Sequence, residues 1–200
     1  MTTLVLVRHA MCDAVGTRIA GRMPGVPLNE CGRVQARRLA ERFRGQTIAA
    51  IYTSPLERAR ETALAIGSQV GREPSELTAL QEIDYGAWTG CTIDELRGDP
   101  RWRDWNEHRA FARVPGGERM LEVQARAVAV LEELAVRHDG DTIVAVSHGD
   151  VIKAVLAHYA GTSLGDLARV EVAPASVSIV VMNEAARQIV RVNDTGALLD

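Results

Sequence analysis

The feature that most constrains the fold is a set of short, continuously apolar runs rich in β-branched residues. These runs occupy residues 3–7, 48–53 and 142–146. A run of this kind is typical of a strand buried on both faces, as in a parallel sheet. Each run is followed at once by polar residues. The sequence therefore predicts three buried strands with polar side chains at their ends.

Segments with helical periodicity separate and follow these strands. One helix is expected from about Asn29, with apolar residues at positions 36, 39, 40 and 43. A second begins at residues 54–57 (SPLE), interpreted as a capping box with proline at the first helical position, and runs to about Val70. A long third helix is expected to open at Gly117, with an apolar stripe at positions 120, 123, 127, 130 and 134. A fourth follows residue 148 and carries positions 151, 154, 155 and 158 on one face.

The alternation of strands and helices predicts an α/β fold with three layers, α/β/α, and a largely parallel central sheet. The tail adds expected strands at 169–172, 176–182 and 188–192, the last two forming a hairpin. The middle of the chain contains the three tryptophans, Trp88, Trp102 and Trp105, and only short helical patches. We interpret residues 1–200 as a single domain in which 84–119 forms a small cap that shapes specificity.

Composition narrows the classes of function. With 46% apolar and 24% charged residues the chain fits a soluble globular protein, and its net charge of −3 gives no general case for nucleic-acid binding. No apolar run reaches the roughly 18 residues that span a bilayer, and no secretory signal is expected, so we expect a cytoplasmic protein without membrane contact. The three cysteines are widely spaced and zinc-binding motifs are absent, so neither a metal nor a cofactor is expected. A homodimer is left open.

Polar residues follow three of the predicted strands in a way that indicates an anion site. Arg8 and His9 end the first strand, Arg58 lies in the first turn of the helix after the second, and His148 follows the third. Ligands of open α/β sheets gather outside the carboxyl ends of the strands, and helix N-termini there favour anions. Two imidazoles and two guanidiniums directed at one crevice suit a phosphoryl group. The expected partner is a small phosphorylated substrate.

Phosphoryl transfer assigns roles to these groups. A neutral imidazole can attack through one ring nitrogen when the other is held, usually by a backbone carbonyl. A second imidazole, if protonated, stabilises charge on the phosphoryl oxygens, and a carboxylic acid must protonate the leaving oxygen. Burial would raise the pKa of that acid. Residue patterns alone do not select it among the 26 acidic residues.

Six ordered segments resemble the histidine phosphatase superfamily, the phosphoglycerate mutase-like group. They are residues 6–10 (LVRHA), 27–36 (PLNECGRVQA), 54–63 (SPLERARETA), 81–90 (QEIDYGAWTG), 115–118 (PGGE) and 146–152 (VSHGDVI). The resemblance implies a phosphohistidine mechanism in which His9 is the nucleophile and Glu82 the general acid. It implies that Arg8, Arg58 and His148 bind the phosphoryl group, His148 also being catalytic. Asp84 is the rival acid, and Arg18, Arg22 and Gly149 are possible accessory residues.

The chain departs from the family pattern after the nucleophile. The family glycine is Ala10 here, which fits only if its φ is not positive. The hydroxyl residue and asparagine that often follow are replaced by a stretch containing Met11, Cys12 and Val15 that is one residue short. Arg18, Arg22, Asp13 and Thr17 are the candidate substitutes for their phosphate contacts.

We therefore predict a metal-independent phosphomonoester phosphatase. A cofactor-dependent mutase is the first alternative, although the span from Gly90 to Pro115 leaves little room for the insertion that family mutases tend to have. A weakly active phospholigand-binding regulatory protein is the second. The tryptophans and arginines of 84–119 are candidate substrate contacts, with packing as the alternative for the tryptophans and solvation for Arg101, Arg103, Arg109, Arg113 and Arg119.

Overall fold

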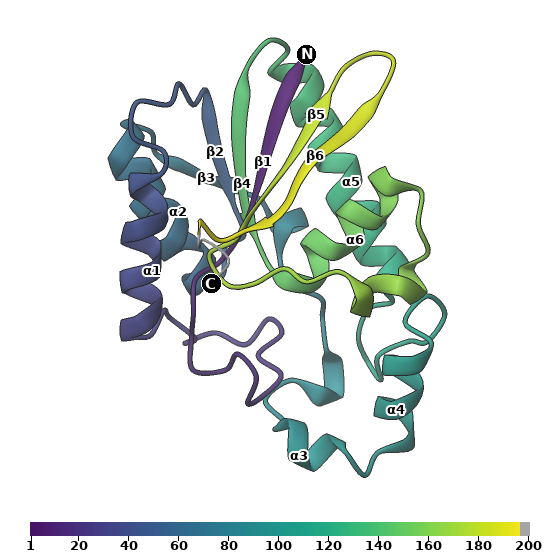
Figure 1. The fold of residues 1–200 in the computed structure, drawn as a ribbon. Coiled ribbons are helices and arrows are strands. Elements are labelled where there is room, and N and C mark those ends of the chain that lie inside the picture. Colours follow the sequence, from purple (N-terminus) through teal and green to yellow (C-terminus); the bar gives the residue numbers. More distant parts are fainter. Residues whose placement is uncertain (197–200) are drawn as a thin grey trace.

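A six-stranded sheet organises residues 1–196, the part of the chain that the computed structural model describes (Figure 1). The strands are β1 (Thr2–Arg8), β2 (Ala50–Thr53), β3 (Pro74–Glu76), β4 (Thr142–Ser147), β5 (Val177–Met182) and β6 (Arg187–Asp194). Their order in space is β3-β2-β4-β1-β5-β6. Strands β3, β2, β4 and β1 are parallel, whereas β5 pairs antiparallel with β1 and β6 antiparallel with β5. The predicted α/β fold with a largely parallel sheet is confirmed, as is the hairpin at the end of the chain.

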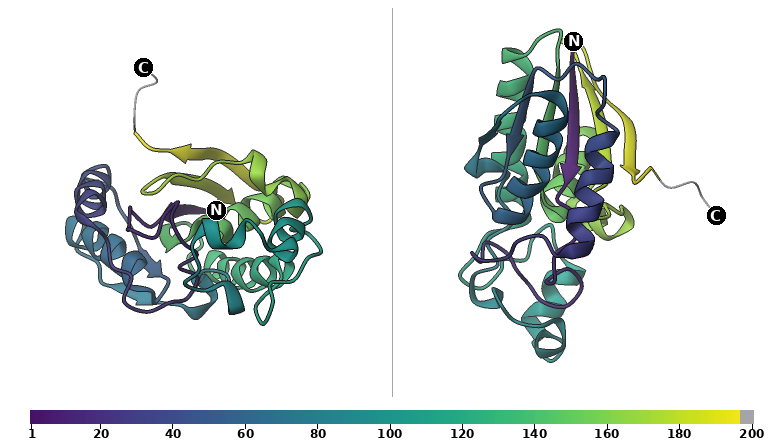
Figure 2. Two further views of the ribbon diagram at one scale, coloured as in Figure 1. Left: turned by 90° about the horizontal axis from the view of Figure 1, so that it is seen from below. Right: turned by 90° about the vertical axis from the view of Figure 1, so that its left-hand side faces the viewer.

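Helices cover both faces of the sheet (Figure 2). They are α1 (Glu30–Glu41) and α2 (Glu57–Val70) on one face, and α5 (Met120–Arg137) and α6 (Gly149–Ala160) on the other. Alternate residues of a strand point to opposite faces. In β1, Val5 and Val7 accordingly join the apolar cluster of α1 and α2, whereas Leu4 and Leu6 join the cluster of α5 and α6. The continuous apolar run of β1 is explained by this burial on both sides.

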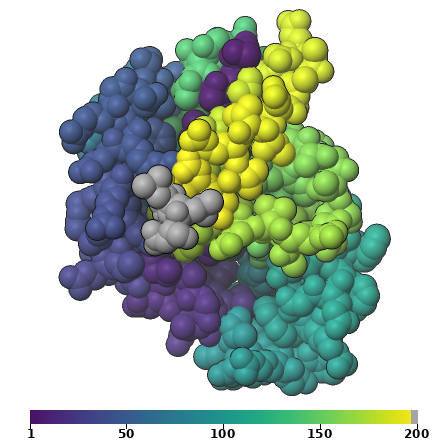
Figure 3. Space-filling view, in the orientation of Figure 1, coloured from purple at the N-terminus to yellow at the C-terminus, as the bar shows by residue number. Residues whose placement is uncertain are grey.

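Two irregular segments lie beyond the carboxyl ends of the parallel strands: residues 9–29 and residues 84–119. The second contains η2 (Gly86–Trp88), α3 (Ile93–Leu96) and α4 (Pro100–Glu107), while η1 (Thr78–Leu80) precedes it. Arg18 and Thr92 form a β-bridge between the two segments, whose surfaces meet at the lower edge of the molecule (Figure 3).

The three tryptophans form the core of segment 84–119. Trp88 and Trp105 are fully buried, and the rings of Trp88 and Trp102 meet edge-on with centroids 5.3 Å apart. This cluster continues into the core beneath α5 and α6. Packing, rather than substrate contact, accounts for all three.

Two helices begin later than predicted. The expected capping box at residues 54–57 is wrong: α2 begins at Glu57, and its cap residue, Leu56, makes no side-chain cap hydrogen bond. The Ser54 hydroxyl is instead within 2.8 Å of His148 Nε2, and the Glu57 carboxylate accepts from the Gly25 amide. Helix α5 begins at Met120 rather than Gly117, because Gly117 packs against the backbone of Asp84.

Three smaller expectations are also wrong. Strand β2 begins at Ala50 rather than at residue 48. Residues 169–172 form no strand: η3 (Leu164–Arg169) ends there, and the Val172 carbonyl accepts from the Arg8 side chain. His158, expected on the apolar face of α6, is exposed.

Candidate active site

The carboxyl ends of β1, β2 and β4 bring the predicted site residues together. Arg8, His9, Arg58 and Glu82 line one pocket of about 230 Å³. His148 lies behind His9, with the two ring centroids 5.1 Å apart. The pocket is smaller than the roughly 300–1,000 Å³ typical of sites for drug-sized ligands. Its size suits a small metabolite.

The His9 ring is held in one tautomer. Its Nδ1 lies 2.7 Å from the Ala10 carbonyl oxygen, and its Nε2 lies 3.3 Å from Nε of Arg58. Because a carbonyl only accepts and a guanidinium only donates, the proton is on Nδ1 and the lone pair on Nε2. Burial, followed by the charges of Arg58 and Arg8, holds the pKa of His9 well below its usual value. At neutral pH the imidazole is therefore uncharged and carries its lone pair on Nε2.

His148 is set by its contact with Ser54. The side chain is fully buried at the N-terminus of α6, and Nε2 is 2.8 Å from the Ser54 hydroxyl. That hydroxyl also accepts from the Leu56 amide over 3.3 Å, and when it gives its own hydrogen to Nε2 the ring proton is on Nδ1. Burial, Arg58 and His9 lower the pKa of His148 well below its usual value. The free protein therefore holds a neutral His148, and the charged form considered from the sequence would require a bound anion.

Three buried nitrogen atoms of this group have no hydrogen-bond partner within residues 1–196. They are Nε of Arg8, Nη1 of Arg58 and Nδ1 of His148. Each arginine is anchored by another of its nitrogens: Arg8 Nη1 donates to the Val172 carbonyl and Arg58 Nη2 to the Gly21 carbonyl. Buried donors are normally paired, so a group of unpaired ones beside a pocket indicates an anionic ligand.

Two small residues allow this arrangement. A Cβ on Gly149 would lie 3.3 Å from Cζ of Arg8, so glycine lets that guanidinium rest on the start of α6. Ala10 is fully buried and is not among the residues of 1–196 with positive φ. The alanine in place of the family glycine is therefore accommodated.

Glu82 projects into the same pocket, whereas Asp84 does not line it. Burial first, and then the negative charge of Asp150, raise the pKa of Glu82 to about 7. Its Oε1 accepts from the Ile83 amide over 3.0 Å. The Asp84 carboxylate is engaged by the Gly86 amide. A carboxyl group that is half-protonated near pH 7 can both give and take a proton.

Sequence reasoning missed a second charged group at the pocket. Tyr85, Asp150 and Lys153 line it, and Asp150 accepts from the Tyr85 hydroxyl over 2.5 Å and from Arg109 over 2.9 Å. Lys153, the one lysine of the chain, is half-buried there. Asp150 and Lys153 come two and five positions after His148, which lies at the end of β4. This closeness in sequence is the signal that could have identified them as pocket residues.

Some of the residues that the sequence suggested as accessory phosphate contacts line the pocket, and others do not. Arg18 lines the pocket and is exposed, and the buried Cys12 lines it too. Arg22 is turned away from it, toward Glu118 and the Glu82 carbonyl. Asp13 and Thr17 are exposed, Asp13 bonding Asn29 and Thr17 the Asp13 carbonyl.

Segment 84–119 contributes little of the pocket lining. Residues 14–21 supply most of the apolar lining, while segment 84–119 adds Tyr85 and Ile93. None of the five arginines named there as candidate substrate contacts lines the pocket, and three of them bind carboxylates of the protein. These pairs are Arg101 with Asp99, Arg109 with Asp150 and Arg113 with Glu122.

Within residues 1–196, no cluster of three or more histidine, cysteine, aspartate or glutamate side chains is arranged to hold a metal ion. Over the same residues, no helix has the length and apolar character needed to cross a bilayer.

Comparison with known proteins finds a matching family and several relatives. A family model described as the histidine phosphatase superfamily (branch 1) matches residues 4–195. The chain is 32% identical over 200 residues to phosphoserine phosphatase 1 of Hydrogenobacter thermophilus, with 98% of this chain and 93% of that protein covered. It is 31% identical over 167 residues to glucosyl-3-phosphoglycerate phosphatase of Mycolicibacterium vanbaalenii, with coverages of 79% and 74%.

Two solved structures resemble the fold closely. Bacillus stearothermophilus YhfR aligns with a TM-score of 0.92 at 33% identity, covering 97% of this chain and 98% of that one. A mutant phosphoserine phosphatase from Entamoeba histolytica, in complex with phosphoserine, aligns with a TM-score of 0.88 at 26% identity and full coverage of both chains.

Proposed function

Because this chain belongs to the histidine phosphatase superfamily, branch 1, we propose that it is a metal-independent phosphatase of small phosphorylated metabolites that acts through a phosphohistidine at His9. The observation that carries the proposal is the state of the His9 ring. Its Nδ1–H is held by the Ala10 carbonyl and its Nε2 accepts from Arg58, while the residue lines a pocket with unpaired buried donors.

In the first step, Nε2 of His9 forms a bond to phosphorus while the bond from phosphorus to the ester oxygen breaks. The carboxyl group of Glu82 gives its proton to the leaving oxygen, and the alcohol departs. Arg8, Arg58 and the Nδ1–H of His148 donate to the phosphoryl oxygens, where negative charge is spread in the transition state.

In the second step, water attacks phosphorus and the Glu82 carboxylate accepts its proton. The bond from phosphorus to Nε2 breaks, which releases inorganic phosphate and restores neutral His9 and protonated Glu82. The pKa of about 7 supports both roles, because an acid and its conjugate base are then present in similar amounts.

The relatives support the choice of substrate class. The similar proteins from Hydrogenobacter thermophilus and Mycolicibacterium vanbaalenii are phosphatases of phosphoserine and of glucosyl-3-phosphoglycerate, both small phosphorylated compounds. The half-buried Lys153 lines the pocket, so we extend the proposal to substrates with a second anionic group.

The test is turnover of p-nitrophenyl phosphate by the purified protein with EDTA present. We expect turnover that is lost in His9→Ala and retained in His108→Ala. His108 is a suitable control because it is an exposed histidine paired with Asp104, outside the residues that line the pocket. Binding of phosphate without turnover of any monoester would favour a regulatory protein instead.

A second assay distinguishes a phosphatase from a mutase. Isomerisation of 3-phosphoglycerate in the presence of a trace of the bisphosphate would indicate transfer to a substrate hydroxyl rather than to water. We expect release of inorganic phosphate and no isomerisation.

A further inference from the structure

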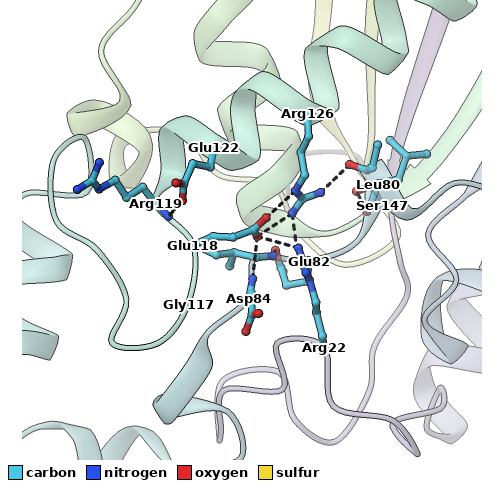
Figure 4. A network of polar contacts seen from close by, with 12 residues as sticks. Arg22, Leu80, Glu82, Asp84, Gly117, Glu118, Arg119, Glu122, Arg126 and Ser147 are labelled. Carbon is cyan, nitrogen blue, oxygen red and sulfur yellow. Dashed lines mark hydrogen bonds and ion pairs between the residues drawn. The ribbon is translucent and has the colours of Figure 1, made fainter.

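The Glu118 carboxylate joins two arginines that come from distant parts of the chain (Figure 4). Its Oε2 accepts from Nη2 of Arg22 over 2.8 Å, and its Oε1 accepts from Nε of Arg126 over 3.0 Å. Arg22 belongs to the loop after β1 and Arg126 to α5. All three side chains are largely buried, with 21–31% of Glu118 and Arg22 and 20% of Arg126 exposed. We call these three residues the Glu118 cluster.

Both arginines of the cluster also hold the backbone of Glu82. The Glu82 carbonyl accepts from Nε of Arg22 over 2.9 Å and from Nη2 of Arg126 over 3.3 Å. Nη1 of Arg126 donates to the carbonyl of Ala79 over 2.6 Å, three residues earlier. The two arginines therefore hold the segment that carries the proposed acid through two backbone carbonyl groups, those of Ala79 and Glu82.

Glu118 reaches the other side of that segment directly. Its Oε2 accepts from the Asp84 amide over 2.9 Å, and its own amide donates to the Asp84 carbonyl over 2.9 Å. Gly117 permits this approach, since a Cβ there would lie 2.1 Å from the Asp84 carbonyl oxygen. Although partial burial opposes it, hydrogen bonds from Arg126 and the Asp84 amide hold the pKa of Glu118 below its usual value. The carboxylate thus stays charged where the enzyme would work.

These contacts matter because the Glu82 carboxyl has few of its own. Within residues 1–196 its one hydrogen bond is from the adjacent Ile83 amide. The position of the carboxyl in the pocket thus depends on where its backbone is fixed. A misplacement of about 1 Å in a reacting group can cost on the order of 100-fold in rate.

We propose that Glu118, with Arg22 and Arg126, positions Glu82 for protonation of the leaving group. The inference rests on the proposed function, and it goes beyond it by assigning a role to residues outside the pocket. None of the three is among the described residues that line the pocket, so they are positioning residues rather than catalytic ones.

The test compares two aryl phosphates of similar shape. Phenol has a pKa near that of tyrosine, about 10, whereas p-nitrophenol is far more acidic and leaves with little protonation. We expect Glu118→Gln to lower kcat/KM for phenyl phosphate by about tenfold or more, a part of the 10²–10⁴ that general acid catalysis contributes. The value for p-nitrophenyl phosphate should change by less than about threefold, because the phosphoryl contacts are intact.

Glu122→Gln is the matched control. Glu122 is the next glutamate along the chain, pairs with Arg113, and is 45% exposed. Its variant should leave the ratio of the two rates unchanged. If Glu118→Gln fails to give a native thermal unfolding transition, Arg22→Met takes its place, because it removes one contact to Glu82 and leaves Arg126 on Glu118.

Equal losses for both esters in a folded variant, or no loss for either, would overturn the positioning role. Wild-type protein that turns over neither ester would contradict the proposed function itself, so the two failures are distinct.

Discussion

Arg58 donates its Nε–H to Nε2 of His9 over 3.3 Å, so the proposed attacking nitrogen is held by a group that also lines the pocket. The same guanidinium is fully buried, is anchored by the Gly21 carbonyl, and keeps a third nitrogen unpaired. One arginine thereby contacts the His9 ring, is anchored by the backbone, and keeps a donor that we propose for the phosphoryl group.

Arg58→Lys tests that combination. A lysine keeps the charge but lacks the planar fork, so it cannot serve the ring, Gly21 and the substrate together. We expect kcat/KM for p-nitrophenyl phosphate to fall about 10²–10³-fold, the effect of removing one donor from a preorganised anion site. Arg60→Lys, in the same helix and paired with Glu76 at the surface, should remain within about threefold of wild type. A change in kcat/KM of less than about threefold in Arg58→Lys would contradict the proposed role of Arg58.

The pH dependence should report Glu82. Its pKa of about 7 predicts that kcat/KM for phenyl phosphate falls as the pH rises through 7, because the acid loses its proton. The pKa of His9 lies well below its usual value, so the nucleophile stays neutral over this range. Rates between pH 6.5 and 9 test this, and Glu82→Gln should abolish the decline. A decline that persists in that variant would assign it to another group.

Asp150 should set where that decline occurs. Its negative charge stabilises the protonated form of Glu82 and so contributes to the raised pKa. In Asp150→Asn the charge is gone, the pKa of Glu82 should fall, and the decline should move to lower pH. The profile of kcat/KM for phenyl phosphate measures the shift. A decline that stayed in place or moved to higher pH would show that Asp150 does not act on Glu82 in this way.

Lys153 should distinguish substrates with a second anionic group. In Lys153→Met, we expect KM for phosphoserine to rise about tenfold, the loss of one charged hydrogen bond of about 1.5 kcal/mol. KM for p-nitrophenyl phosphate should be nearly unchanged, since this substrate has no anionic group besides the phosphoryl group. Arg18→Met provides the comparison at the exposed edge of the pocket. An equal rise for both substrates would place Lys153 on the phosphoryl group instead.

Much of the fold and part of the site could be predicted from local sequence. The apolar runs of β1 and β4 are buried on both faces, so their ends locate Arg8, His9 and His148 without further information. Arg58 follows from its place in the first turn of α2. Glu82 required the family resemblance, because no local pattern separates one loop glutamate from another.

The rest depends on contacts between distant residues. The sequence around Ser54 predicts a helix cap at this residue, yet its hydroxyl contacts His148, 94 positions later. The residues that hold Glu82 are likewise remote: Arg22 bonds a carbonyl 60 positions later and Arg126 one 44 positions earlier. Periodicity and capping rules describe neighbours in sequence and carry no information on such pairs.

The central claim is that the phosphoryl group passes through Nε2 of His9. The most direct measurement mixes the protein with a fast-turning substrate, stops the reaction under alkaline conditions, and locates the phosphate by mass spectrometry of peptides. The account predicts a phosphohistidine in the peptide that contains His9, and none in His9→Ala. Phosphate on His148, or full turnover with no phosphohistidine at any time after mixing, would contradict it.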